Sequence, residues 1–117
     1  MIETRLGDFE EVLMLIIGIL GDGESYAFRI AQEFQTQTGR SVSIGAVHST
    51  LDRLETKGFL KSEIQEGESD RGTRKKRIYA ITALGKRVLK EAMEFKVSLW
   101  KQYPAFSAKF NISFSSL

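Results

Sequence analysis

The stretch RSVSIGAVHSTLDRLETKGFL, residues 40–60, is the part of the sequence around which the other segments are arranged. Ser43 is a good helix N-cap, because its hydroxyl can accept a hydrogen bond from a free amide of the first turn, and Gly58 supplies the positive-φ residue that commonly follows a helix. These signals predict a helix over residues 44–57. At 100° per residue its apolar face is formed by Ile44, Val47, Leu51 and Leu54.

The opposite face of this helix is small, polar and only mildly charged. It carries Gly45, Ser49, Asp52, Arg53 and Thr56. Such a face can lie close against a groove and offer hydrogen bonds, as a helix that reads the DNA major groove must do. The alternative is the ordinary solvated face of an amphipathic helix, and residues 40–60 alone favour that alternative.

The composition is that of an ordinary globular domain. The chain has 117 residues, of which 42% are hydrophobic and 27% charged, and this size is typical of one domain with a modest core. It has no cysteine, which excludes a disulfide framework or a thiolate metal site. The single histidine, His48, also argues against a histidine-built metal centre. We therefore expect no metal and no cofactor.

The hydropathy pattern argues against a membrane protein. The densest apolar run, residues 12–20, has nine residues, whereas a helix needs about 20 to span a bilayer. The residues before it are mainly acidic, which is the wrong sign for a signal peptide. We expect a cytoplasmic protein with no membrane partner.

The net charge of +2 hides an asymmetry along the chain. Residues 1–40 carry three basic and seven acidic side chains, whereas residues 41–117 carry fourteen and eight. A basic region that begins at the predicted reading helix is typical of a nucleic-acid-binding protein, although such an imbalance is weak evidence by itself.

Two further helices are expected before residue 40. Residues 8–20 are apolar nearly all the way round the helical wheel, which indicates burial on more than one side. In so small a domain we expect the second side to contact another subunit through Leu13 and Ile17. Ser25 is expected to cap a supporting helix that ends at Gly39.

A short β-hairpin is predicted after the reading helix. Its strands span residues 60–66 and 76–81, joined by the turn-rich segment 67–73. Cations gather at its tip and returning strand: Arg71, Arg74, Lys75, Lys76 and Arg77. A run like this is usually a solvated loop. Directly after a helix-turn-helix pattern, however, it is placed where a wing would contact the phosphate backbone or the minor groove.

A long helix is expected from the cap Thr82 to about Gln102, before Pro104. One apolar stripe contains Leu84, Val88, Ala92, Phe95 and Leu99 and can close over its own domain. A second stripe has no obvious partner within the chain, so we assign it to a dimer interface: Leu89, Met93 and Trp100. Met93 and Trp100 can alternatively be core residues or line a pocket for a flat aromatic ligand. The apolar tail, residues 105–117, fits neither the helical nor the strand period.

These elements predict a mainly α fold with a small β-hairpin. We expect a winged helix-turn-helix domain over residues 1–82, a long C-terminal dimerisation helix over residues 83–103, and a tail over residues 104–117. The predicted DNA contacts come from the reading helix and the wing: Ser43, Gly45, His48, Ser49, Arg53, Arg71, Arg74, Lys75 and Lys76.

In this order and spacing the chain resembles the PadR family of bacterial winged-helix transcriptional regulators, in the short form with one C-terminal dimerisation helix. The matching motifs are LGDFEEVLMLIIGIL (6–20), SYAFRI (25–30), SIGAVHSTLDRLETKGFL (43–60) and RGTRKKRIYAITALG (71–85). The resemblance implies that Gly45, Ser49 and Arg53 face the major groove. It places Arg71, Arg74 and Lys75 in the wing, and Tyr79 and Thr82 at the junction of strand and helix.

The chain departs from the family pattern at three positions. His48 stands where the family usually has tyrosine, Ala27 where it often has glycine, and Thr73 where a second glycine is common. On the wheel His48 lies between the two faces of the reading helix, so a phosphate contact and a packed histidine are both open, and a pH switch is the third alternative.

The resemblance implies a homodimeric repressor that binds double-stranded DNA at an inverted-repeat operator and, in some relatives, responds to a small aromatic effector. We expect no enzyme, because spacing identifies no nucleophile, acid-base pair, metal-ligand set or phosphate-binding glycine loop. The alternative is a winged-helix module that binds another protein, with the basic hairpin contacting an acidic partner.

Overall fold

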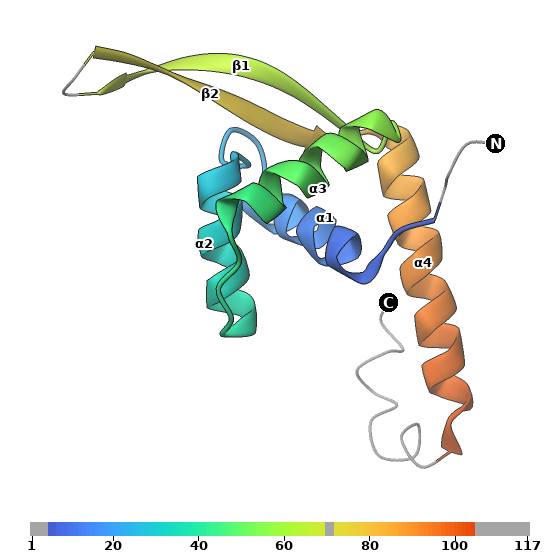
Figure 1. Ribbon diagram of the computed structural model, residues 1–117. Helices are drawn as coiled ribbons and strands as arrows, with labels where there is room; N and C mark the ends of the chain where they lie inside the picture. The colour runs from blue at the N-terminus through green and yellow to red at the C-terminus, as the bar shows by residue number, and fades with distance from the viewer. Residues whose placement is uncertain (1–4, 70–71, 105–117) are drawn as a thin grey trace.

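The computed structural model of the chain describes residues 5–69 and 72–104. In chain order it contains α1 (Asp8–Leu20), α2 (Ala27–Thr38), α3 (Ile44–Thr56), β1 (Leu60–Ser69), β2 (Gly72–Ile81) and α4 (Ala83–Gln102). The first three helices form a compact body, the hairpin extends from it in one direction, and α4 leaves it in another (Figure 1). The mainly helical winged helix-turn-helix architecture is thus confirmed.

The local signals at the ends of α3 and α4 act as expected. The Ser43 hydroxyl accepts a hydrogen bond from the Ala46 N–H at 3.1 Å, and the Thr82 hydroxyl accepts one from the Gly85 N–H at 3.0 Å. Gly58 follows α3 with a φ of 85°, a conformation that costs a glycine little. Both helix starts and the end of α3 therefore lie within a residue or two of their predicted positions.

The expected cap on α2 is wrong. Tyr26, not Ser25, precedes the helix, and its side chain makes no capping hydrogen bond. The buried Ser25 hydroxyl lies 3.3 Å from both the Ile17 and Gly21 carbonyl oxygens, to which it can donate. The Ser25 carbonyl accepts from the Tyr79 N–H at 2.9 Å. Ser25 therefore joins α1, α2 and the hairpin, because the α1–α2 turn folds back on the end of α1.

The hairpin is longer than predicted. Its antiparallel register runs from Leu60 opposite Ile81 to Ser69 opposite Gly72, and it includes Gly67 opposite Arg74. Strand pairing needs only backbone amides and carbonyls, so residues with turn-like side chains can still extend the ladder. The wing is consequently a long two-stranded ribbon (Figure 1).

One hydrophobic core joins the three helices to the base of the hairpin. Its fully buried large side chains are Leu13, Met14, Ile16, Ile30, Val47, Leu51, Leu54 and Phe59. Ile44, expected on the buried face of α3, is instead 45% exposed. As the first residue of the helix it lies beyond the side chains that cover the rest of that face. Among the described residues, none of the helices is both long and apolar enough to cross a membrane.

The prediction that Leu13 and Ile17 contact another subunit is wrong. They are 0% and 3% exposed and lie in the chain's own core, so neither is available to a partner. The apolar side chains that α1 exposes are Leu15 and Ile19, at 40% and 63%. The wheel showed that α1 is apolar on several sides, but not which side its own domain covers.

The two stripes of α4 are also used differently from the prediction. Leu89, assigned to a dimer interface, packs against the core together with Leu84 and Val88. Phe95 and Leu99, expected to close over the domain, are 65% and 52% exposed. Since α4 leaves the body after its first turns, only the early members of either stripe can reach the core (Figure 1).

Candidate nucleic-acid interface

The outer face of α3 is open to solvent along its length. Gly45, His48, Ser49, Asp52 and Thr56 are all exposed. Apart from its chain neighbours and the backbone of its own helix turn, no atom of the described residues lies within 4 Å of the position that a Cβ on Gly45 would take. The expected small polar face therefore exists, and a flat or grooved partner can approach its backbone closely.

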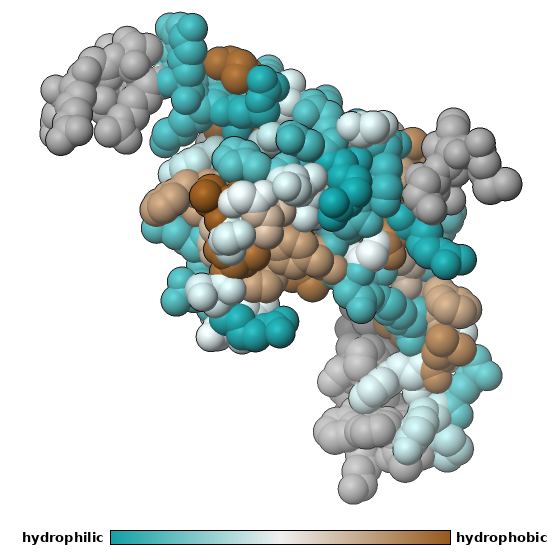
Figure 2. All heavy atoms as spheres, viewed as in Figure 1, coloured by the Kyte–Doolittle hydropathy of each residue, from teal (hydrophilic) through white to brown (hydrophobic). Residues whose placement is uncertain are grey.

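The hairpin lies beside α3, and its exposed surface is mostly hydrophilic in the view of Figure 2. Lys75, Lys76 and Arg77 are all exposed on β2. Arg71 lies outside the described residues, and only the backbone of Arg74 is described. The structure thus brings wing cations next to the reading helix, as expected.

Two of these cations have structural partners at the base of the wing. The Lys76 ammonium lies 4.1 Å from the centre of the Tyr26 ring on the loop before α2, which is a cation–π contact. On the other face, Arg77 Nη1 donates to the Ser62 hydroxyl at 3.0 Å, which in turn donates to Glu55 of α3 at 2.7 Å. The wing is therefore fastened to both helices of the helix-turn-helix.

A crevice of about 290 Å³ separates the wing from the helix-turn-helix. Its lining includes His48 and Asp52 of α3, Lys75 of the wing and Phe28 of α2. His48 is exposed here, so its interpretation as a packed core histidine is wrong. The phosphate contact predicted for His48 stays a prediction.

Tyr79 is buried where the hairpin meets the helices, at 4% exposure. Burial raises the pKa of its phenol above the ordinary value, and the nearby charges of Asp52 and Glu55 raise the pKa further. Tyr79 is thus a neutral, fixed part of the junction at any physiological pH.

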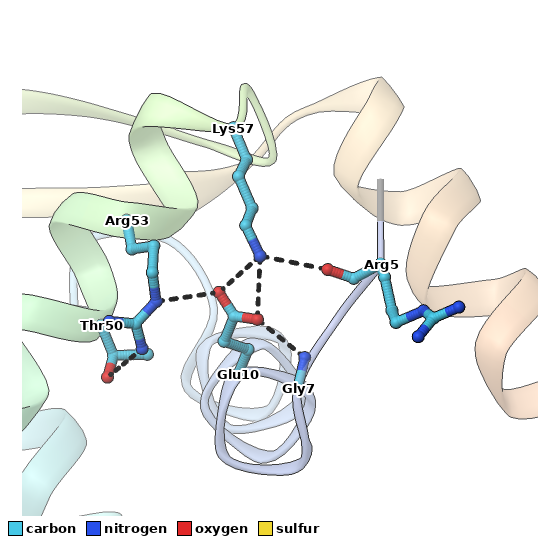
Figure 3. Close-up of polar contacts among 6 residues, drawn as sticks. All are labelled: Arg5, Gly7, Glu10, Thr50, Arg53 and Lys57. Carbon is cyan, nitrogen blue, oxygen red and sulfur yellow. Dashed lines mark hydrogen bonds and ion pairs between the residues drawn. The ribbon is translucent and has the colours of Figure 1, made fainter. Parts of the chain in front are cut away.

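A buried carboxylate connects α1 to α3 (Figure 3). Glu10 is 5% exposed, and Lys57 Nζ lies 3.0 Å from each of its oxygens. Its Oε1 also accepts from the Gly7 N–H at 2.7 Å, and its Oε2 lies 3.4 Å from Arg53 Nε. Burial alone would raise the pKa of Glu10, but the Gly7 amide, Lys57 and Arg53 together lower it below the ordinary value.

Arg53, predicted to read bases, therefore already uses part of its guanidinium in a contact with Glu10. Its Nη2 also donates to the Thr50 hydroxyl at 3.3 Å, while 53% of its side chain stays exposed. Glu10 and Lys57 were not predicted as members of this site. No local pattern signals the contact, because 43 positions separate Glu10 from Arg53 in the sequence.

The sequence from residue 16 to residue 91 matches the model of the PadR-like family of transcriptional regulators. This match covers well over half of the chain. The chain belongs to the PadR-like family. No curated protein sequence matches it.

Solved structures of PadR-like proteins share the fold. A PadR-like transcription factor from Bacteroides fragilis has 26% identity and a TM-score of 0.62, over 78% of this chain and 82% of that one. A PadR family regulator from Clostridium difficile has 26% identity and a TM-score of 0.54, over 87% of this chain and 97% of that one. Bacillus subtilis PadR in complex with operator DNA has 22% identity and a TM-score of 0.58, over 73% of this chain and 47% of that one.

Proposed function

We propose that this PadR-like protein is a homodimeric repressor that binds an inverted-repeat operator in double-stranded DNA. The observation that carries the proposal is the open polar face of α3 with the basic wing fastened beside it. Ser43, Gly45, His48 and Ser49 would meet the major groove, and the wing cations would contact the phosphates. The complex of Bacillus subtilis PadR with operator DNA supports this use of the fold.

The dimer is proposed to form through α4. Phe95 and Leu99 expose large apolar side chains there, and hydrophobic groups are visible along part of this helix in Figure 2. A salt bridge joins Lys96 of α4 to Glu11 of α1, and Leu15 lies four residues after Glu11 on the same side of α1. A second copy covering Phe95, Leu99, Leu15 and Ile19 would bury them all.

Two copies related by a twofold axis present two reading helices to one face of the DNA. Such helices enter successive major grooves about 34 Å apart. A protein held there would block transcription from an overlapping promoter, which is the basis of the proposed repression.

A small aromatic effector is a further part of the proposal. An open pocket of about 660 Å³ lies beside α4, and its described lining comes from one face of that helix, including Met93, Val97 and Lys101. This volume falls in the range of small-molecule sites. Met93 was predicted to line such a site together with Trp100, but Trp100 is not one of the described residues that line this pocket.

The test is selection of bound sequences from a pool of random duplexes, followed by titrations of the selected and a random duplex. We expect the random duplex to bind at low salt and an inverted repeat to be enriched. If the protein binds no duplex even at low salt, the module for an acidic protein partner is the better explanation.

A further inference from the structure

We infer that Glu10, a residue of α1 outside the proposed DNA-facing surface, is a positioning residue that determines base specificity by orienting Arg53. This inference rests on the proposed DNA binding. It concerns how one side chain of the reading helix acquires a fixed conformation before DNA arrives.

The carboxylate of Glu10 is itself rigidly held. Two groups fix it through three contacts: the Gly7 amide at 2.7 Å from Oε1, and Lys57 Nζ at 3.0 Å from each oxygen. Lys57 is in turn only 15% exposed and also donates to the Arg5 carbonyl at 3.1 Å. The Glu10 carboxylate is therefore held in a fixed position beneath the reading helix (Figure 3).

Arg53 contacts the Glu10 carboxylate through one edge of its guanidinium. Its Nε faces Glu10 Oε2 at 3.4 Å, and its Nη2 donates to the Thr50 hydroxyl at 3.3 Å. These two nitrogens lie on the same edge of the planar group, so the protein restrains both the side-chain rotamer and the plane of the guanidinium. About half of the side chain remains exposed on the face of α3 that carries Ser49 and Thr56.

Charge neutralisation does not account for the contact. Lys57 already sits closer to the carboxylate than Arg53 does, at 3.0 Å against 3.4 Å. With one carboxylate and two cations, the cluster keeps a positive charge that DNA can use. A guanidinium that is restrained before binding loses less conformational entropy when it forms a bidentate hydrogen bond to a base such as guanine.

The experiment measures the affinity ratio between the selected duplex and a random duplex for wild type, Glu10→Gln, Thr50→Val and Arg53→Ala. Thr50→Val removes the hydroxyl without changing the charge and nearly preserves the shape, so it also tests the idea if Glu10→Gln folds poorly. Glu33→Gln is the matched control, because it also removes a carboxylate that pairs with an arginine, Arg29 at 3.0 Å within α2, away from the proposed DNA contacts and dimer face.

We expect Arg53→Ala to lower the affinity ratio by at least about fivefold, the loss expected for one base-specific contact. Glu10→Gln and Thr50→Val should lose part of the same preference, and neither should lower it further in the Arg53→Ala background, whereas Glu33→Gln should preserve the ratio. The inference is overturned by an unchanged ratio in both Glu10→Gln and Thr50→Val, by an equal loss in Glu33→Gln, or by losses that add to that of Arg53→Ala. If the wild type enriches no sequence, the proposed function itself fails.

Discussion

At the scale of single residues, the cations of the wing are not equivalent. Lys75, Lys76 and Arg77 all line the crevice beside α3, but Lys76 and Arg77 also hold the hairpin against Tyr26 and Ser62. A basic run in the sequence therefore contains both anchors of the wing and groups available to DNA, and the effects of substituting them should differ.

Lys75→Ala should weaken binding to the selected and the random duplex by the same factor, because a phosphate contact carries no base information. The plot of log affinity against log salt should also become less steep by about one for each subunit. Anisotropy titrations at several salt concentrations measure both effects. Lys90→Ala, which removes a lysine of α4 paired with Glu94 at 3.7 Å, is the control and should change neither. A loss confined to the selected duplex would contradict the phosphate role.

Glu10 should make the stability of the protein depend on acid pH. Its pKa is lowered in the folded state from the ordinary value of 4.5, so its ionised form stabilises the fold above that pH. This contribution is lost as the pH falls below 4.5 toward the folded-state pKa. Urea unfolding between pH 2 and 7 should show a shallower loss of stability in Glu10→Gln than in the wild type. Identical pH dependence in the two proteins would mean that Glu10 is not stabilised as an anion.

At the scale of elements, the start of α4 packs closely on Phe59, the residue just before β1. A Cβ placed on Gly85 would lie 2.2 Å from the Phe59 carbonyl oxygen and 3.0 Å from Ile81 Cγ2. Backbone atoms cannot move aside as a flexible side chain can. This contact fixes the position at which α4 leaves the body.

Gly85→Ala should therefore destabilise the protein by about 1–3 kcal/mol, the usual cost of overpacking. Gly45→Ala is the matched control. It also lies in a helix, but among the described residues the added methyl meets nothing within 4 Å beyond its neighbours and its own helix backbone, so improved helix propensity should stabilise it by up to about 1 kcal/mol. Urea unfolding midpoints report both changes. A Gly85→Ala protein as stable as the wild type would show that α4 shifts easily on Phe59.

The elements themselves were largely predictable, because their signals are local. The capping hydroxyls of Ser43 and Thr82 and the positive φ of Gly58 involve residues within three positions of the helix ends. Which element packs on each apolar helix face was not predictable in this way. Periodicity shows that Leu13 and Ile17 share a side of α1, but only the packing of α2 and α3 decides that this side is buried.

The candidate site shows the same division. The open polar face of α3 follows from its helical period, and it was predicted. The contacts of Arg53 with Glu10 and of Lys76 with Tyr26 join residues far apart in the sequence, and they arise only when the helices and the hairpin are packed together. Sequence reasoning therefore found the residues that face outward and did not find those that hold them.

At the scale of the whole molecule, the exposed apolar side chains of α4 predict the oligomeric state. We expect the wild type to sediment as a dimer and Leu99→Asp to sediment as a monomer, because a carboxylate cannot be buried at an apolar interface without a partner. Ile64→Asp is the control, since Ile64 on the wing is 51% exposed against 52% for Leu99. Dissociation by both variants, or by neither, would contradict an interface through α4.

The dimer should also set the salt dependence of DNA binding. Four wing cations in each copy would neutralise about eight phosphates, which gives a slope of about −7 for log affinity against log salt. Titrations of the selected duplex from low to moderate salt measure it. A slope near half this value would indicate that only one wing of the dimer engages the DNA.

The junction between α3 and α4 makes α4 a lever with its pivot beside the reading helix. The Thr82 hydroxyl donates to the Gly58 carbonyl at 2.7 Å, and the Thr82 N–H donates to the Phe59 carbonyl at 3.0 Å, so the pivot of α4 is bonded directly behind the reading helix. A helix of this length is about 30 Å long, so a 10° tilt moves its far end by about 5 Å and the pivot hardly at all. A tilt at the far end of α4 would consequently reach α3 as the same rotation with a much smaller displacement.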